Sequence, residues 1–591
     1  MRQRNLPIGI QDFEKLITNG FIYVDKTDYI YNLIQQKTPI FLSRPRRFGK
    51  SLLTSTMRAY WEGKKELFKN LKIIKLRDNL TEQHEQRDRE EQNVEQGGQD
   101  NNIPWLPHPV FYFDFNGVNY QEGTSALENK LKNLLTDWEA MYGDAFRDRQ
   151  LGERFYKLLQ LACEKTGSKA VVLVDEYDKP LLDVLDEPEL KKHNKAVFKG
   201  FFSVLKEADR YLQFVFITGV TKFEKVSIFS DLNQLRDISF SKEYTALCGI
   251  TEQEITEYFS PEIEAMAEEQ GLSIEECLAR LKQTYDGYHF HQIHQVVHQN
   301  SVDRIVGNGD SVSIANNGDR SVGRVNNVDS LGIYNPFSLL NAFADKDFRS
   351  YWFSTGTPTF LVNKMAKCAF DVRKLTDKTL YSDEQRLSDY RANNPDLIPL
   401  LYQTGYLTIV DYDAKRKRYT LAFPNEEVKY GMLNSLLPAY APRTVIDTGL
   451  DIFSLDEALE EGDLERVKNI FIGLFAMIPY PSVAGEDEVR DPFENYFQSV
   501  FEITFLLLGQ YVSCEKHTAT GRIDCIVKTS SFIYIFEFKR DGKAEDALKQ
   551  IEEKGYALPF VADHERKLFK IGVVFDSKKR MLKEWRVAEG K

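Results

Sequence analysis

The chain has 591 residues, more than a single hydrophobic core usually organises, so the sequence predicts two to four domains. Hydrophobic residues make up 42% and charged residues 28% of the chain, a balance that excludes a disordered, collagen-like or coiled-coil protein. The net charge of −12 excludes a protein that is basic throughout, although a local basic groove remains compatible with it.

Six cysteines are scattered along the chain without a CxxC pair. This usage favours a reduced, cytoplasmic protein over a disulfide framework or a structural zinc site. The first residues, MRQRNLPIGIQDFEKLI, contain no apolar stretch of the kind that a secretory signal needs. The longest apolar cluster, 503–508, is far shorter than the roughly 20 residues of a membrane span. We therefore expect a cytoplasmic protein with no membrane partner.

Short apolar runs alternate with helical segments over the first 250 residues. Runs that predict buried strands occur at 40–42, 110–115, 170–174 and 214–218. The run at 170–174 is unbroken, as expected for a strand covered on both faces of a parallel sheet. Because tens of residues separate most of these runs, the sequence predicts an α/β fold with a parallel sheet built from βαβ units.

Two stretches interrupt this pattern. Residues 77–103 are rich in Gln, Glu and Asn, and residues 292–330 repeat short phrases of Asn, Gly, Asp, Ser and Val. Neither stretch has enough apolar residues to offset the entropy of ordering its backbone, about 1–2 kcal/mol per residue. We interpret both as surface insertions.

The pattern becomes helical from about Thr251. Residues 371–485 are predicted to be mainly helical, with a hairpin that turns around 411–417, and an α/β unit follows. The predicted parts are a parallel-sheet domain, a helical extension of it, a helical connecting region and a C-terminal α/β domain. Their bounds are 1–250, 251–370, 371–485 and 486–591.

A phosphate-binding loop is indicated by FLSRPRRFGKSLLT at 41–54, where a strand end and a turn precede a helix. In this context backbone N–H groups wrap phosphates, Lys50 reaches the β and γ oxygens, and Ser51 is a ligand of Mg²⁺. Arg44 stands where the motif GxxxxGK[ST] has its first glycine. The predicted nucleotide-binding residues of the loop are Arg46, Arg47, Phe48, Gly49, Lys50 and Ser51.

Two other predicted strands end in polar residues. The run at 170–174 leads into Asp175 and Glu176, and the run at 214–218 ends in Thr218. Adjacent acids after a buried strand are costly unless they meet a cation or water. The functional interpretation gives Asp175 to the Mg²⁺ shell, Glu176 to the attacking water and Thr218 to the γ-phosphate. The structural alternative is a strand-to-loop boundary with solvated carboxylates.

These motifs occur in a characteristic order along the chain. The series is YVDKT, SRPRRFGKSLL, VLVDEYDKPL, TGVTKF, SDLNQL, YDGYHF, YNPFSLL and YW…TGTP. It resembles the bacterial AAA-ATPase-like family, and the resemblance covers nearly the whole chain outside the two insertions. It implies a P-loop ATPase module joined to a C-terminal nuclease-like domain. Members of that family carry the form PRRFGKS, so Arg44 looks like a family trait.

A second site is indicated by GRIDCIVKTSSFIYIFEFK at 521–539, where two β-rich runs flank a turn. If the loop is Ser530-Ser531, Asp524 pairs with Glu537 across the hairpin and Lys539 projects from the same face. Two facing acids can share a divalent metal, and a neighbouring lysine can orient the hydrolytic water. The structural alternative is a surface hairpin with a cross-strand ion pair.

This spacing, with a helix on each side, resembles the PD-(D/E)XK nuclease fold. The resemblance makes Asp524, Glu537 and Lys539 the catalytic core, with Asp524 and Glu537 as metal ligands. It adds Glu494 from the preceding helix and Gln550 from the following helix as supporting positions. The proline that usually precedes the aspartate is Ile523 here.

The sequence therefore predicts an ATP- and Mg²⁺-binding ATPase coupled to a nuclease that acts on nucleic acid, with DNA as the expected substrate and Mn²⁺ as an alternative metal. A homo-oligomer is compatible with this prediction. The alternative is a nucleotide-switched binding or signalling protein whose C-terminal fold binds nucleic acid or a partner without cleavage. The retention of all three core residues favours the nuclease. Arg44 at the glycine position leaves the nucleotide-switched binding protein as an alternative.

Overall fold

The computed structural model describes residues 5–77, 105–143, 147–222, 228–229, 232, 235–291, 332–353, 359–368, 370–376, 380–388, 396–441, 445–476, 492–509, 513–518, 521–561, 563–576, 579 and 581–590. For residues 445–450, 492–498, 513–518 and 521–524 it describes only the backbone. Most of the two predicted insertions lies outside the described residues.

The N-terminal part is built on a five-stranded parallel sheet in the order β2-β3-β4-β1-β5. Its strands are β1 (Ile40–Ser43), β2 (Val110–Asp114), β3 (Ala170–Asp175), β4 (Leu212–Gly219) and β5 (Arg236–Asp237). The four strands predicted from apolar runs are confirmed. All residues of β3 are buried, because helices cover both faces of this interior strand.

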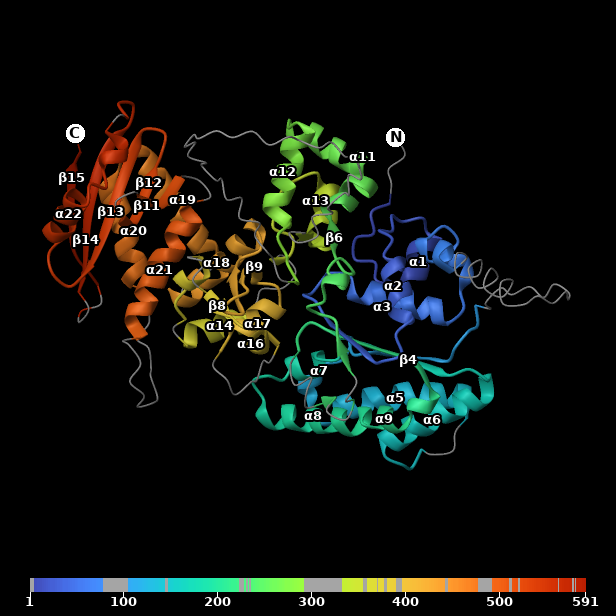
Figure 1. The fold of residues 1–591 in the computed structure, drawn as a ribbon. Coiled ribbons are helices and arrows are strands. Elements are labelled where there is room, and N and C mark those ends of the chain that lie inside the picture. Colours follow the sequence, from blue (N-terminus) through green and yellow to red (C-terminus); the bar gives the residue numbers. More distant parts are fainter. Residues whose placement is uncertain are drawn as a thin grey trace, which may run out of the picture.

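Two helical layers sandwich the sheet (Figure 1). One layer contains α1 (Phe13–Thr18), α2 (Thr27–Ile34) and α3 (Lys50–Trp61). The other contains α5 (Ser125–Tyr142), α6 (Leu151–Thr166), α7 (Lys179–Leu182), α8 (Pro188–Phe202) and α9 (Val204–Glu207). The carboxyl ends of the parallel strands meet at one edge, where ligands of open α/β sheets bind.

The next part of the chain forms two smaller units. The first contains α11 (Glu252–Gln270), α12 (Ile274–Tyr285), α13 (Pro336–Asp345) and the paired strands β6 (Ile250–Thr251) and β7 (Ile333–Tyr334). The second contains α14 (Thr359–Lys367), α15 (Arg373–Thr376), α16 (Glu384–Ser388), α17 (Ile398–Gln403), α18 (Glu426–Tyr440) and a sheet in the order β8-β10-β9.

The strands of that sheet are β8 (Leu380–Ser382), β9 (Thr408–Asp413) and β10 (Arg418–Ala422). The antiparallel pair β9–β10 confirms the hairpin predicted around 411–417. The short strand β8 adds to β10 on its other side and was not predicted.

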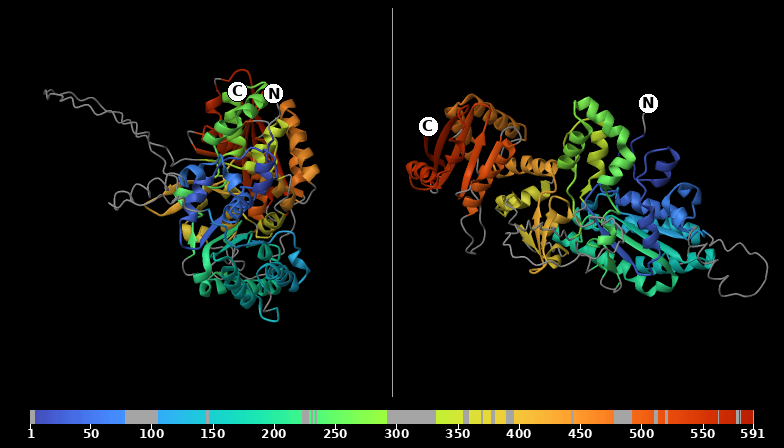
Figure 2. Two further views of the ribbon diagram at one scale, coloured as in Figure 1. Left: turned by 90° about the vertical axis from the view of Figure 1, so that its right-hand side faces the viewer. Right: turned by 45° about the horizontal axis from the view of Figure 1, so that its top comes forward.

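The C-terminal part is a mixed sheet in the order β11-β12-β13-β14-β15, set apart from the N-terminal sheet (Figure 2). Its strands are β11 (Ser513–Thr518), β12 (Gly521–Lys528), β13 (Phe532–Arg540), β14 (Lys567–Asp576) and β15 (Met581–Glu589). The parallel pair β13–β14 is joined through α22 (Ala544–Glu553). Three further helices, α19 (Val445–Glu461), α20 (Leu464–Ala476) and α21 (Pro492–Leu508), precede the sheet.

None of the helices in the described part of the chain is long and apolar enough to cross a membrane.

The described residues at the edges of the two predicted insertions contact each other. Arg77, the first residue of the predicted insertion 77–103, belongs to the described fold, because its guanidinium carbon lies 4.8 Å from the centre of the Trp105 ring. Tyr288 and Ile333 exchange backbone hydrogen bonds of 3.4 and 3.0 Å. The core is therefore closed by contacts that lie outside residues 78–103 and 292–330.

We expect two single-deletion chains, in which a short Gly/Ser bridge replaces either 78–103 or 292–330, to melt within a few degrees of the original chain. The reason is that loop length contributes to stability only logarithmically. Calorimetry of each single deletion measures the effect. A large loss of soluble protein would show that a deleted stretch is a structural element.

Candidate functional site

The loop between β1 and α3 makes a left-handed turn into the helix. Gly49, the N-cap of α3, has a φ of 90°, and Arg47 has a φ of 70°. A positive φ favours glycine, so the turn depends on Gly49. Arg44 is not among the residues with a positive φ. The first position of this loop therefore has no conformational need for glycine.

Arg44 instead holds the loop against the segment after β5. Its guanidinium is buried and donates hydrogen bonds to the carbonyl oxygens of Ser43, Ser239 and Tyr244, at 3.0, 2.8 and 3.0 Å. The guanidinium carbon also lies 4.1 Å from the centre of the Phe290 ring. A buried arginine that donates to three carbonyls rigidifies the backbone around it. Arg44 is a structural residue of the loop.

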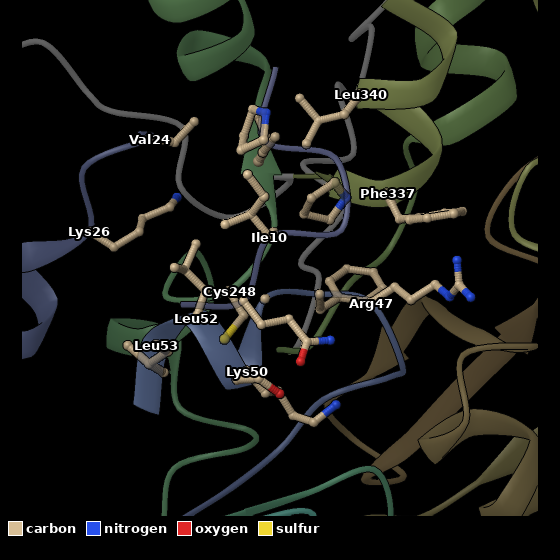
Figure 3. A pocket seen from close by; sticks show the side chains of 18 of the residues that line it. Ile10, Val24, Lys26, Arg47, Lys50, Leu52, Leu53, Cys248, Phe337 and Leu340 are labelled. Atoms are coloured by element: carbon tan, nitrogen blue, oxygen red, sulfur yellow. The ribbon is translucent and has the colours of Figure 1, made fainter. Parts of the chain in front are cut away.

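A cavity of about 430 Å³ lies at the N-terminus of α3, within the size range of small-molecule sites. Its polar end is lined by Arg46, Lys50, Ser51 and Glu176. Figure 3 shows the opposite, apolar wall, which is lined by Ile10, Val24, Phe337 and Leu340. The first two of these residues come from the N-terminal segment and the other two from α13. A charged end next to an apolar wall suits the phosphates and the base of a nucleotide.

The buried Lys50 ammonium donates a 3.1 Å hydrogen bond to the carbonyl oxygen of Pro45. It is therefore held beside the loop that the sequence predicts to bind phosphate. Phe48, also predicted to bind nucleotide, is buried and lines the cavity. Arg47 lines it too, with its guanidinium carbon 3.8 Å from the centre of the Phe337 ring.

Asp175 and Thr218 lie at the carboxyl ends of the adjacent strands β3 and β4. Both side chains are buried, and within the described residues neither the Asp175 carboxylate oxygens nor the Thr218 hydroxyl has a hydrogen-bond partner. Buried polar atoms usually have a hydrogen-bond partner, and a bound cation with its waters would supply one to these side chains. Carboxylate and hydroxyl oxygens are suitable ligands for Mg²⁺ and its bound waters.

Burial raises the pKa of Asp175 to about 6, because the carboxylate is shielded from water. Two neighbours partly lower the pKa again. One is the Ser51 hydroxyl, which lies near the carboxylate but outside hydrogen-bond geometry, and the other is the positive charge of Lys50. Because the pKa of Asp175 is higher in the folded chain than its ordinary value of 3.8, ionisation of this carboxyl destabilises the fold without a bound cation as the pH rises from that value to about 6. A cation bound there would reverse that penalty, so the residues present fit Mg²⁺.

Glu176 follows the end of β3 with a φ of 51°, unusual for a residue other than glycine. Such backbone strain is concentrated at functional sites. Burial raises the pKa of Glu176, while the charges of Lys50 and Arg46 lower it. Glu176 therefore lies close to two cations of the loop and lines the cavity beside Lys50.

Two features of this region were not predicted. Asp178 is buried and accepts hydrogen bonds from the backbone N–H groups of Val220 and Thr221, at 3.2 and 2.6 Å, which ties the end of β3 to that of β4. Lys26 lines the cavity and pairs with Glu254 of α11 at 2.5 Å. These partners lie 42 and more than 200 residues apart, and no local pattern could have indicated them.

The hairpin register predicted for the C-terminal sheet is confirmed from Cys525 to Lys528, which pair with Phe536 to Ile533. Strand β13 alternates between two environments. Ile533 and Ile535 pack with Ile551 of α22, whereas Phe536 packs against Phe505 of α21. Glu537 and Lys539 continue the α22 side of the alternation.

Glu537, Lys539 and Gln550 form a cluster on that side. Lys539 donates a 3.1 Å hydrogen bond to Glu537, and Gln550 is hydrogen-bonded to both. Glu537 is 3% exposed, whereas 30% of the Lys539 side chain is exposed. The cluster thus combines a buried carboxylate with a cation that reaches solvent, as the predicted metal and water roles require.

Asp524 lies in β12 and Glu494 in α21, but both side chains are outside the described residues. If the observed register continues by one pair beyond Cys525 and Phe536, the backbone of Asp524 lies opposite Glu537. Within the described ranges, no group of three or more His, Cys, Asp or Glu side chains is arranged to hold a metal ion.

Comparisons with known proteins identify both ends of the chain. The family described as "Predicted AAA-ATPase" matches residues 7–229, and the PD-(D/E)XK nuclease superfamily matches residues 492–585. A protein of Azotobacter chroococcum mcd 1, described as "Uncharacterized protein in vnfD 5'region", is 34% identical over 566 residues, which cover 94% of each chain. No solved structure matches the chain.

Proposed function

We propose that this chain, which belongs to the predicted AAA-ATPase-like family, binds and hydrolyses ATP. We also propose that its C-terminal PD-(D/E)XK nuclease domain cuts DNA in a metal-dependent reaction. The observation that carries the first half is that, among the residues the structure describes, the buried polar atoms of Asp175 and Thr218 have no hydrogen-bond partner, while Ser51 and Lys50 lie close to Asp175.

In this proposal the backbone N–H groups of the loop from Arg46 to Ser51 wrap the phosphates, and the Lys50 side chain reaches the β and γ oxygens. Ser51 and Asp175 would hold Mg²⁺, which would shield the negative charge of the phosphates. Glu176 orients the attacking water, and Thr218 contacts the γ-phosphate. The apolar wall around Ile10 and Phe337 accepts the base.

In the nuclease domain, Asp524 and Glu537 hold a divalent metal, which would polarise the scissile phosphate. Lys539 orients the hydrolytic water and stabilises the negative charge that develops on the phosphate. Gln550 positions Lys539 and Glu537 through its hydrogen bonds to both. Glu494 supports the cluster from α21.

Helix α18 supports the coupling of the two activities. It contacts α12 of the ATPase extension and α21, which precedes the nuclease sheet. The carboxylate of Glu427, near the start of α18, also accepts backbone hydrogen bonds from Tyr351 and Trp352, at 2.6 and 2.7 Å. A movement of the extension on nucleotide binding would therefore reach α21 through one helix, α18.

We expect Lys50→Ala to weaken ATP binding at least about tenfold, or about 1.4 kcal/mol, because it removes the cation from the phosphate end of the cavity. Titration calorimetry measures this affinity. Lys64→Ala is a matched control, because this half-buried lysine lies beyond the end of α3 and pairs with Glu14 and Glu62. Unchanged ATP affinity in Lys50→Ala would remove the phosphate-binding role.

The nuclease half is tested with linear DNA, circular DNA and RNA, each with Mg²⁺ or Mn²⁺ and with or without ATP. We expect cleavage of DNA that depends on the metal and changes with ATP. Binding of nucleic acid without cleavage under every condition would favour the nucleotide-switched binding protein instead.

A further inference from the structure

The arginines of the segment Arg44-Pro45-Arg46-Arg47 have three different environments. Arg44 is buried among backbone carbonyl groups, and Arg47 stacks on Phe337 of α13 (Figure 3). Arg46 is exposed and forms no hydrogen bond or ion pair with any residue that the structure describes. Of the three cations, Arg46 is thus the one whose guanidinium is available to a ligand.

Arg46 lies between two cavities. It lines the cavity of about 430 Å³ at Lys50 and also a second, polar cavity of about 250 Å³. Glu176 is the other residue that lines both. The remaining walls of the second cavity come from the carboxyl edge of the sheet and α7, and consist of Asn116, Asp178, Lys179, Leu182 and Val220. Arg46 and Glu176 therefore form the boundary between the phosphate end and a polar space.

The two boundary residues lie side by side at the sheet edge, since Arg46 and Glu176 are the two residues that line both cavities. The proposed function requires two groups at this boundary: a carboxylate that orients water and a cation that meets the charge developing on the γ-phosphoryl group. The chain supplies both from its own loop and strand end.

We propose that Arg46 is an arginine finger that acts within its own chain, contacting the γ-phosphate of ATP bound at Lys50 and Ser51. This inference rests on the proposed function, because it assigns a role at the same site. The second cavity then supplies the water that Glu176 orients.

The reaction that this arrangement serves is ordinary hydrolysis. The water oxygen forms a bond to the γ-phosphorus, and the bond from that phosphorus to the β–γ bridging oxygen breaks, leaving its electron pair on ADP. The water proton passes to Glu176 and from there to the released phosphate. Arg46 stays protonated and stabilises the charge on the γ-phosphoryl oxygens as the bond breaks.

Arginine suits this role because its planar fork donates two hydrogen bonds to phosphoryl oxygens. Lysine keeps the charge without that fork. The inference therefore predicts an order of turnover in which the original chain exceeds Arg46→Lys, and Arg46→Lys exceeds Arg46→Ala. It also predicts a turnover per chain that does not depend on protein concentration, since no residue of a neighbouring subunit is needed.

The test compares the full-length chain with Arg46→Ala, Arg46→Lys and Arg416→Ala. Arg416 is an exposed arginine of the β9–β10 turn that pairs with Asp413, so its loss is a charge-matched control. We measure turnover, ATP affinity, and the affinity for ADP·Mg²⁺ with and without aluminium fluoride, which mimics the transferring phosphoryl group. The last measurement needs no turnover.

We expect Arg46→Ala to reduce turnover at least about a hundredfold, consistent with the loss of an arginine finger, while its ATP affinity stays within about threefold of the original. We also expect it to lose the tightening of ADP binding by aluminium fluoride. Arg416→Ala should match the original chain in every measurement.

Several outcomes would overturn the inference. Turnover and fluoride-dependent tightening that persist in Arg46→Ala would show that another cation meets the phosphoryl group. An ATP affinity that falls in parallel with turnover would make Arg46 a binding residue only. Turnover per chain that rises with protein concentration would indicate a finger from a neighbouring subunit. An original chain that binds no ATP would refute the proposed function and, with it, this inference.

Discussion

Glu176→Gln is expected to bind ATP and hold it without hydrolysis. Gln keeps the size of the side chain and its place between the two cavities, but it cannot accept the proton of the attacking water. Asp175, Lys50 and Ser51 are unchanged in this variant, so ATP affinity should stay close to that of the original chain. Turnover should fall by about two to three orders of magnitude, as for the loss of a general base.

Single-turnover hydrolysis and the nucleotide content of the purified protein measure this effect. Glu153→Gln is a suitable control, because Glu153 is an exposed acid on α6 whose pairing with Arg149 is loose, at 3.8 Å. Hydrolysis at the original rate in Glu176→Gln would move the water-orienting role elsewhere. The first alternative is Asp114, which ends β2 and pairs with Asp175 in the sheet register.

The strands and the turn of the candidate sites were predictable because their signals are local. An unbroken apolar run indicates a strand buried on both faces, and GKS after such a strand indicates the helix start that the structure has at Lys50. The hairpin register also follows from the loop length alone, because antiparallel pairing fixes a constant sum of residue numbers.

The contacts that complete the ATP site were not predictable from the sequence. Arg44 contacts Ser239 and Tyr244 across nearly 200 residues, and Lys26 reaches Glu254 across 228. Hydrophobic periodicity does not report such pairs, since it reflects which face of an element is buried and not what buries it. The apolar wall from α13 is likewise a product of tertiary packing.

The opposite environments of Arg44 and Arg46 illustrate this limit. Both are arginines of one short turn, and the sequence separates them only by their position in the motif, which does not indicate that one of them is buried. The structure buries the first against carbonyl groups and leaves the second at the boundary of two cavities. Chemical roles within a motif therefore depend on which distant segment lies beside each residue.

In the nuclease domain, the largest effect is expected from Asp524→Ala and Lys539→Ala, each of which should abolish metal-dependent cleavage. Removal of Asp524 leaves Glu537 as the lone carboxylate for the metal, which weakens metal binding and leaves the water unactivated. Removal of Lys539 leaves the developing phosphate charge unopposed. Both variants are expected to fold, and for Lys539→Ala the reason is that 30% of the Lys539 side chain is already exposed.

Lys549→Ala separates this effect from a general loss of positive charge. Lys549 is the residue before Gln550 on α22, and 72% of its side chain is exposed in a loose pair with Glu553. Its loss should leave cleavage unchanged, whereas Gln550→Ala should give an intermediate loss, because Gln550 only positions Lys539 and Glu537. Equal cleavage by the original chain and Asp524→Ala would place the activity at another site or in a contaminant. We expect the loss of cleavage to increase from Lys549→Ala, which has none, through Gln550→Ala to Lys539→Ala. If the cluster were purely structural, variants that fold equally well would not show this increase.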